Sequence, residues 1–173
     1  ETMQFTATGS DAHGNAVAIS PTWSVVASGG TVDSTGLFTA GTTSGAFAST
    51  VQATVGAVSG SGSVVVNPGA LATIVVTPDS VSIATGATQQ FTAVGTDAHG
   101  NVVPIAPHWF VVAGGGTIDQ TGLFTADSTP GNYPGTVRAS INQHCFVIAG
   151  TSTVTVTGDI LLPTSIAHAP ARD

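Results

Sequence analysis

Short runs of alternating apolar and polar residues fill this chain, and they predict β-strands throughout. The run Ile105–Val112 places four apolar side chains on one face at a period of two: Ile105, Pro107, Trp109 and Val111. The run Thr136–Ile141 does the same with Val137, Ala139 and Ile141. Further runs span 71–77, 80–83, 88–95, 122–126 and 151–157, with Gly, Pro and Asn between them. No run has the 3.6-residue period of a helix, so we expect an all-β protein.

The chain repeats itself. The phrase FTATGSDAHGNAVAI at Phe5–Ile19 returns as FTAVGTDAHGNVVPI at Phe91–Ile105. The phrase GGTVDSTGLFTA at Gly29–Ala40 returns as GGTIDQTGLFTA at Gly115–Ala126, again 86 positions further on. A period of this length suits one small domain with its own core, so the chain contains two copies of one domain.

Each copy predicts an antiparallel sandwich of about seven short strands with an aromatic anchor, Trp23 in the first copy and Trp109 in the second. The fold class is therefore all-β: two tandem immunoglobulin-like antiparallel β-sandwiches, the first lacking its N-terminal strand. We place the incomplete domain 1 at residues 1–67, a linker at 68–70, domain 2 at 71–157 and a C-terminal tail at 158–173. Both tryptophans are expected to be buried at equivalent places.

Composition narrows the possible partners. Lys and Arg number 2 against 9 Asp and Glu, which gives a net charge of −7, and only 6% of residues are charged. Nucleic acid is excluded as a partner because phosphate binding needs a basic surface. No apolar run reaches the ~20 residues of a membrane span, so the chain is not expected to span a membrane. Abundant Thr, Ser, Gly and Val with few charges favour an extracellular or bacterial cell-surface location.

Several phrases resemble the bacterial immunoglobulin-like repeats of surface proteins, the intimin and invasin type of group 2. They are Gln90–Ala93, Asp97–Asn101, Trp109, Gly116–Asp119 and Thr121–Ala126, with matching phrases in the first copy. The resemblance covers roughly residues 1–157. It implies an extracellular, non-catalytic module that serves as a stalk, an adhesin segment or a fibre subunit, and it names no ligand.

The DAHGN phrase, at Asp11–Asn15 and Asp97–Asn101, is the main candidate site. Its Asp, His and Asn could ligate a cation, joined by Asp33 or Asp119. Alternatively, the Asp accepts backbone N–H bonds within a turn, and we favour this interpretation because hard-cation sites gather several carboxylates. We therefore expect no metal and no cofactor. No GxSxG phrase or close carboxylate pair is present, so we expect no catalytic residue and no enzymatic activity.

The segment before the last strand is longer in the second copy: Ile141–Gly150 against Val55–Gly60. It contains Cys145, the only cysteine, so no intrachain disulfide can form. We expect this apolar loop to lie along its own domain or against a partner.

The first copy has no counterpart of the 16 residues Leu71–Gly86, whereas the 16-residue tail follows the second copy. A sandwich without this strand exposes an apolar groove and unpaired edge amides. The tail residues Ile160, Leu161, Leu162 and Ile166 could fill the groove of a neighbouring molecule, with Ile160, Leu162 and Ile166 on one face, against Phe5, Val64 and Val66. The alternative is that preceding residues of the same chain fill it.

These patterns predict a non-catalytic extracellular structural protein, a subunit of a surface filament or fibre that self-associates head to tail by donor-strand addition. One alternative is a stalk or ligand-binding segment of a larger bacterial adhesin. Another is an accessory module of a secreted polysaccharide enzyme, with a carbohydrate ligand.

Overall fold

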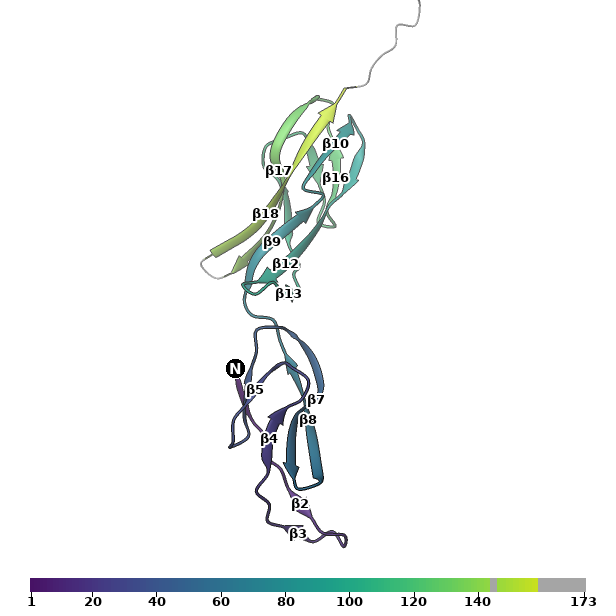
Figure 1. Ribbon diagram of the computed structural model, residues 1–173. Coiled ribbons are helices and arrows are strands. Elements are labelled where there is room, and N and C mark those ends of the chain that lie inside the picture. Colours follow the sequence, from purple (N-terminus) through teal and green to yellow (C-terminus); the bar gives the residue numbers. More distant parts are fainter. Residues whose placement is uncertain (144–145, 159–173) are drawn as a thin grey trace, which may run out of the picture. The chain divides into compact units, whose positions relative to one another are not determined.

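The computed structural model describes residues 1–143 and 146–158, and these residues form strands and turns without a helix (Figure 1). The all-β prediction is confirmed. None of the described segments is a helix that is long and apolar enough to cross a membrane. The chain divides into two compact units: unit 1 comprises residues 1–72 and 96–103, and unit 2 comprises 73–95 and the residues from 104 onward.

The first eight strands belong to unit 1. They are β1 (Thr2–Gln4), β2 (Gly9–Ser10), β3 (Ala16–Val17), β4 (Thr22–Val25), β5 (Gly30–Val32), β6 (Leu37–Ala40), β7 (Gly45–Val55) and β8 (Val58–Val66). They form three sheets, with strand orders β4-β7-β8, β1-β6-β5 and β2-β3.

The second copy contributes ten strands. They are β9 (Leu71–Thr77), β10 (Ser80–Ala84), β11 (Thr88–Gln90), β12 (Thr92–Asp97), β13 (Val102–Val103), β14 (His108–Val111), β15 (Gly116–Ile118), β16 (Leu123–Ala126), β17 (Gly131–Gln143) and β18 (Phe146–Thr157). Their sheets have the orders β10-β18-β17-β14, β11-β16-β15 and β13-β12-β9.

The sheets of the two copies correspond strand by strand, with one difference at each of two edges. The sheet β10-β18-β17-β14 corresponds to β4-β7-β8, and the sheet β13-β12-β9 corresponds to β2-β3. In both cases the first copy has one strand fewer. The two strands without a counterpart in unit 1 are β9 and β10, which make up the segment that sequence comparison found missing.

Alternation of side chains explains the core. In the second copy, Phe91, Phe124, Val137 and Val154 are fully buried, and Leu71, Ile74 and Val76 of β9 are buried as well. Phe91 and Phe124 meet edge to face with ring centroids 6.2 Å apart, and Phe5 and Phe38 repeat this geometry at the same distance in unit 1. This arrangement is favourable for aromatic rings because the positive edge of one meets the negative face of the other.

Three predictions about strands need correction. One pair is parallel: β10 runs alongside β18 with Ser80 opposite Thr153, although an antiparallel sandwich was expected. The strand predicted at Ile105–Val112 begins at His108, after Pro107, which has no N–H to donate to a ladder. The predicted loop 141–150 is largely a hairpin, because Ile141 pairs with Ile148 and Asn142 with Val147 (Figure 1).

The first two residues of β18 are exposed. Phe146 is 76% exposed and Val147 is 57% exposed. Cys145 lies outside the described residues, so the structure does not place its thiol.

Candidate functional site

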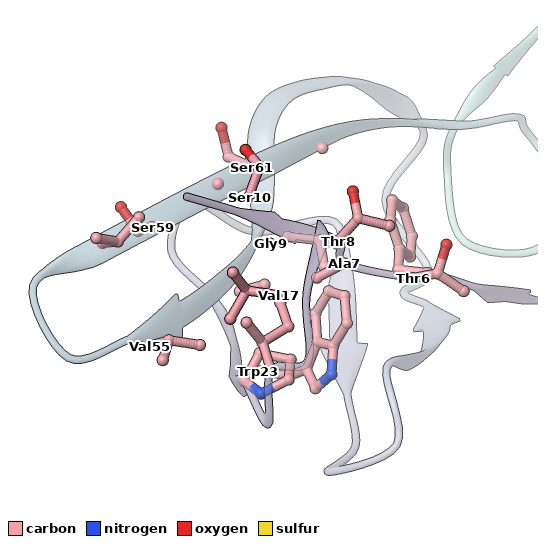
Figure 2. A pocket seen from close by; sticks show the side chains of 18 residues that line it. Thr6, Ala7, Thr8, Gly9, Ser10, Val17, Trp23, Val55, Ser59 and Ser61 are labelled. Carbon is pink, nitrogen blue, oxygen red and sulfur yellow. The ribbon is translucent and has the colours of Figure 1, made fainter. Parts of the chain in front are cut away.

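Unit 1 has a groove on one side of its core, with a volume of about 520 Å³. Figure 2 shows Val17 and Trp23 among its lining side chains, with Ser59 and Ser61 on β8. The lining comes from the segment between β1 and β4, which includes β2 and β3, from β4 itself, and from the β7–β8 hairpin. We call this cavity the groove. Its lining has apolar side chains, hydroxyls and main chain but no charged residue, which suits an uncharged extended peptide better than an ion.

The aromatic residues of the groove are the clearest difference between the copies. Trp109 is 5% exposed and Phe91 is 1% exposed in unit 2. Their counterparts, Trp23 and Phe5, are half-buried and line the groove. The expectation of two equally buried tryptophans is therefore confirmed for Trp109 but not for Trp23. Among the described residues of unit 1, no strand takes the place that β9 has in the sheet β13-β12-β9, so the aromatic rings have less cover.

A glycine in the last strand of each copy shows which strand of the second copy lies at the place of the groove. The hairpin registers place Gly60 opposite Ala53, and Gly150 opposite Ala139, so these two glycines occupy equivalent positions. A Cβ on Gly150 would collide with the carbonyl oxygen of Ile74 and lie 3.1 Å from Val76 Cγ2. The same Cβ on Gly60 meets no atom of the described chain within 4 Å. The groove thus corresponds to the space that β9 occupies in unit 2.

The edge of β8 is also open. In unit 2, β10 pairs with β18 from Ser80 opposite Thr153 to Ala84 opposite Thr157. The equivalent stretch of β8 is 63–67, where β8 ends the sheet β4-β7-β8 among the described residues. Val65 in this stretch is 68% exposed. An open edge with exposed apolar side chains favours the addition of another strand.

The acceptor residues named from the sequence divide into two groups. Phe5 lines the groove. Val64 and Val66 are buried beside Phe38 in the core of unit 1 and are not among the lining residues. Position along β8 explains this difference, because the lining comes from the end of β8 near the turn, residues 58–62. Gly60 was not predicted from the sequence. It aligns with Gly150 once the first hairpin pair of each copy is matched, Val55 with Val58 and Ile141 with Ile148.

The proposed donor residues Ile160, Leu161, Leu162 and Ile166 lie outside the described residues.

The DAHGN loops have the turn structure that the sequence predicts. Asp11 Oδ1 accepts hydrogen bonds from the backbone N–H groups of His13 and Asn15, each 2.9 Å long, and Asp11 Oδ2 accepts one from Asn15 Nδ2. Asp97 forms the same bonds with His99 and Asn101. Both oxygens of each carboxylate are thus used within the loop, which accounts for the conserved spacing within the chain without a metal ion.

The second DAHGN loop, part of unit 1, makes additional contacts. The Gly69 N–H donates to Asp97 Oδ2 at 2.8 Å, and the Ser44 N–H donates to Asn101 Oδ1 at 2.8 Å. Asn101 Nδ2 also donates to the carbonyl oxygen of Thr42. Asp97 is accordingly 5% exposed, whereas Asp11 is exposed.

Hydrogen bonds lower the pKa of all four turn aspartates. The Asn101 amide is the main cause at Asp97, partly opposed by desolvation, and the Asn15 amide is the main cause at Asp11. At Asp33 and Asp119 the main cause is the hydroxyl of the Thr two residues on. These carboxylates are therefore held in the ionised form, which suits a structural acceptor and not a general acid.

Within residues 1–143 and 146–158, no group of three or more His, Cys, Asp or Glu side chains is placed to hold a metal ion. His108 is exposed on β14, with its ring 6.5 Å from the ring of Phe110. The groove and the open edge of β8 are thus the features with the clearest capacity to bind something.

Neither a protein-family model nor a curated protein matches the chain. Among solved structures, the chain is similar to the S-layer protein rSbsC(31–844), at 20% identity and a TM-score of 0.41 over 88% of this chain and 22% of that one. It is similar to domains 1–6 of the surface layer protein SbsC, at 20% identity and a TM-score of 0.43 over 91% and 23%. It is also similar to SbsC domains 4 and 5, at 20% identity and a TM-score of 0.40 over 87% of this chain and 80% of that one. The chain spans less than a quarter of the first two structures.

Proposed function

We propose that this protein is a non-catalytic structural protein of the bacterial exterior, built from immunoglobulin-like sandwiches and assembled head to tail into a filament or fibre. The observation that carries the proposal is the groove of unit 1 together with the open edge of β8. Unit 2 offers the internal comparison, because the same place is filled there by β9 and β10.

Physical chemistry favours occupation of the groove. Half-buried Trp23 and Phe5 leave apolar surface in contact with water, and covering it contributes about 25 cal/mol per Å². The free main-chain groups of the β8 edge supply direction and register to an added strand. The low charge of the chain adds little repulsion between molecules.

The surface composition supports an exterior location. Charged residues make up 6% of the chain, and hydroxyl-bearing strand residues such as Thr and Ser replace them on exposed faces. The turn aspartates are held by their own loops, which supports a structural and not a catalytic role for them.

The test is the state of association of the full chain. Sedimentation velocity and electron microscopy over a range of concentrations should show oligomers that grow with concentration. Replacing the four apolar tail residues Ile160, Leu161, Leu162 and Ile166 by Ser should leave monomers, because the donor loses its apolar contacts. The matched control replaces Phe146 and Val147 by Ser, which removes exposed apolar surface from unit 2 without touching the tail.

A parent chain that remains monomeric at all concentrations would refute assembly through this protein alone. The stalk or ligand-binding segment of a larger adhesin would then be the better hypothesis. Oligomers that persist after the tail substitutions would refute the role of the tail.

A further inference from the structure

We propose that the tail of one molecule enters the groove of a second molecule in the register that β9 and β10 hold in unit 2, with Pro163 at the position of Pro78. This inference rests on the proposed head-to-tail assembly and specifies its contact residue by residue. The occupant is the segment 160–166 of a second copy of the same chain.

The first argument is a pattern shared by the tail and the strand pair of unit 2. The tail reads ILLPTSI at residues 160–166, and β9 and β10 read VVTPDSV at residues 75–81. In order, each segment has two apolar residues, one residue that differs in type between the two, Pro, one polar residue, Ser, and one β-branched apolar residue. Pro ends one strand by removing a donor and sets the backbone for the next, so its position fixes the register of both.

The register decides which tail side chain enters the groove. Val76 is buried and lies against Gly150, whereas Val75 is 57% exposed. Leu161 corresponds to Val76 and would therefore lie over Gly60. Ile160 corresponds to the exposed Val75. Alternation within the tail alone would instead place Ile160, Leu162 and Ile166 on the inner face, so the two assignments differ.

The second argument comes from the edge of β8. In unit 2 the Thr153 N–H donates to the Asp79 carbonyl at 3.0 Å, and Ser80 lies opposite Thr153. The equivalent residue of β8 is Ser63, so its N–H would donate to the carbonyl of Thr164, and Ser165 would lie opposite Ser63. One bond of unit 2 has no counterpart, because Gly62 replaces Ser152, whose hydroxyl also donates to Asp79.

Gly60 gives a test that spares the fold of unit 1. A side chain at Gly60 has open space in the described structure, whereas a side chain at Gly150 would collide with the main chain of β9. Gly60→Thr should therefore leave the melting temperature of unit 1 unchanged or higher, because Thr favours strands. It should also weaken association by roughly tenfold or more, since the Thr side chain occupies the space of the incoming strand.

The matched control is Ser24→Thr, at an exposed position of β4 that does not line the groove. This variant should associate like the parent chain. Equal association of the parent and Gly60→Thr would overturn the proposed register.

Cross-linking tests the register directly, in a Cys145→Ala background. A chain with Ser63→Cys mixed with a chain with Ser165→Cys should form a disulfide-linked pair under mild oxidation, because directly opposed strand residues lie within disulfide reach. Thr164→Cys in place of Ser165→Cys should give far less product, since a shift of one residue turns the side chain to the other face.

The outcomes separate this inference from the proposed function. Oligomers without the Ser63–Ser165 link, or oligomers insensitive to Gly60→Thr, overturn the register and leave head-to-tail assembly standing. If the disulfide forms within one chain that carries both cysteines, but never between two chains, then the occupant of the groove is not a second copy. A monomeric parent overturns both proposals together.

Discussion

Replacing each tryptophan by alanine tests the difference between the two units most directly. Trp109 is 5% exposed, so Trp109→Ala removes a buried ring and leaves a cavity. Such substitutions cost about 3–5 kcal/mol. Trp23 occupies the equivalent strand position but is half-buried and lines the groove. Water can fill the space left by Trp23→Ala, so the cavity contribution is largely absent and a cost of about 1–2 kcal/mol follows from the smaller area removed from water.

The assay is chemical denaturation of both variants and the parent, followed by circular dichroism at a concentration where the chain is monomeric. Trp109→Ala should lower the free energy of unfolding by at least twice as much as Trp23→Ala. Conservative Trp→Phe variants serve as controls, because they keep an aromatic ring in each core. Equal losses for the two alanine variants, or a larger loss for Trp23→Ala, would show that the groove is closed in solution and refute this reasoning.

Three further predictions concern the turns and the buried hydroxyls. The pKa of Asp97 in the folded chain is lowered. Its stabilising contribution is therefore complete above the unfolded pKa of about 3.9 and is lost as the pH falls below that value. On acid titration, Asp97→Asn should lose less stability than the parent. Calcium or zinc should leave the melting temperature unchanged, since each loop satisfies its own Asp, and a clear rise with either ion would contradict this. Thr136→Val and Thr50→Val should each cost about 1–3 kcal/mol, because each hydroxyl is buried and donates a 2.6 Å bond to a carbonyl; denaturation curves that leave either variant as stable as the parent would refute the estimate.

Local signals in the sequence predict the turns well. The Asp side chains close the DAHGN loops as expected, because Asx turns depend on residues two to four positions apart. The strands β9, β16 and β14 lie at or inside the predicted runs, since alternation at period two reports which side of a strand is covered.

The prediction of a loop at 141–150 is wrong for a physical reason. Asn142 and Gln143 are poor strand residues by composition, yet β17 continues through them because β18 supplies a partner for each backbone group. Propensity is a weak guide where cross-strand pairing decides. Likewise, the sequence named Val64 and Val66 as groove residues because they are apolar, whereas their positions on β8 place them in the core.

The sequence alone determined that the chain contains two copies of one all-β domain, and that each copy has the same turns and the same aromatic anchor. These are properties of spacing and residue type. Tertiary structure decided how deeply each anchor is buried. The same tryptophan is buried in one unit and lines a groove in the other, because burial depends on strands that are distant in sequence and not on the residue itself. The open position above Gly60 likewise follows from which strand lies across it, and no local pattern around Gly60 contains that information.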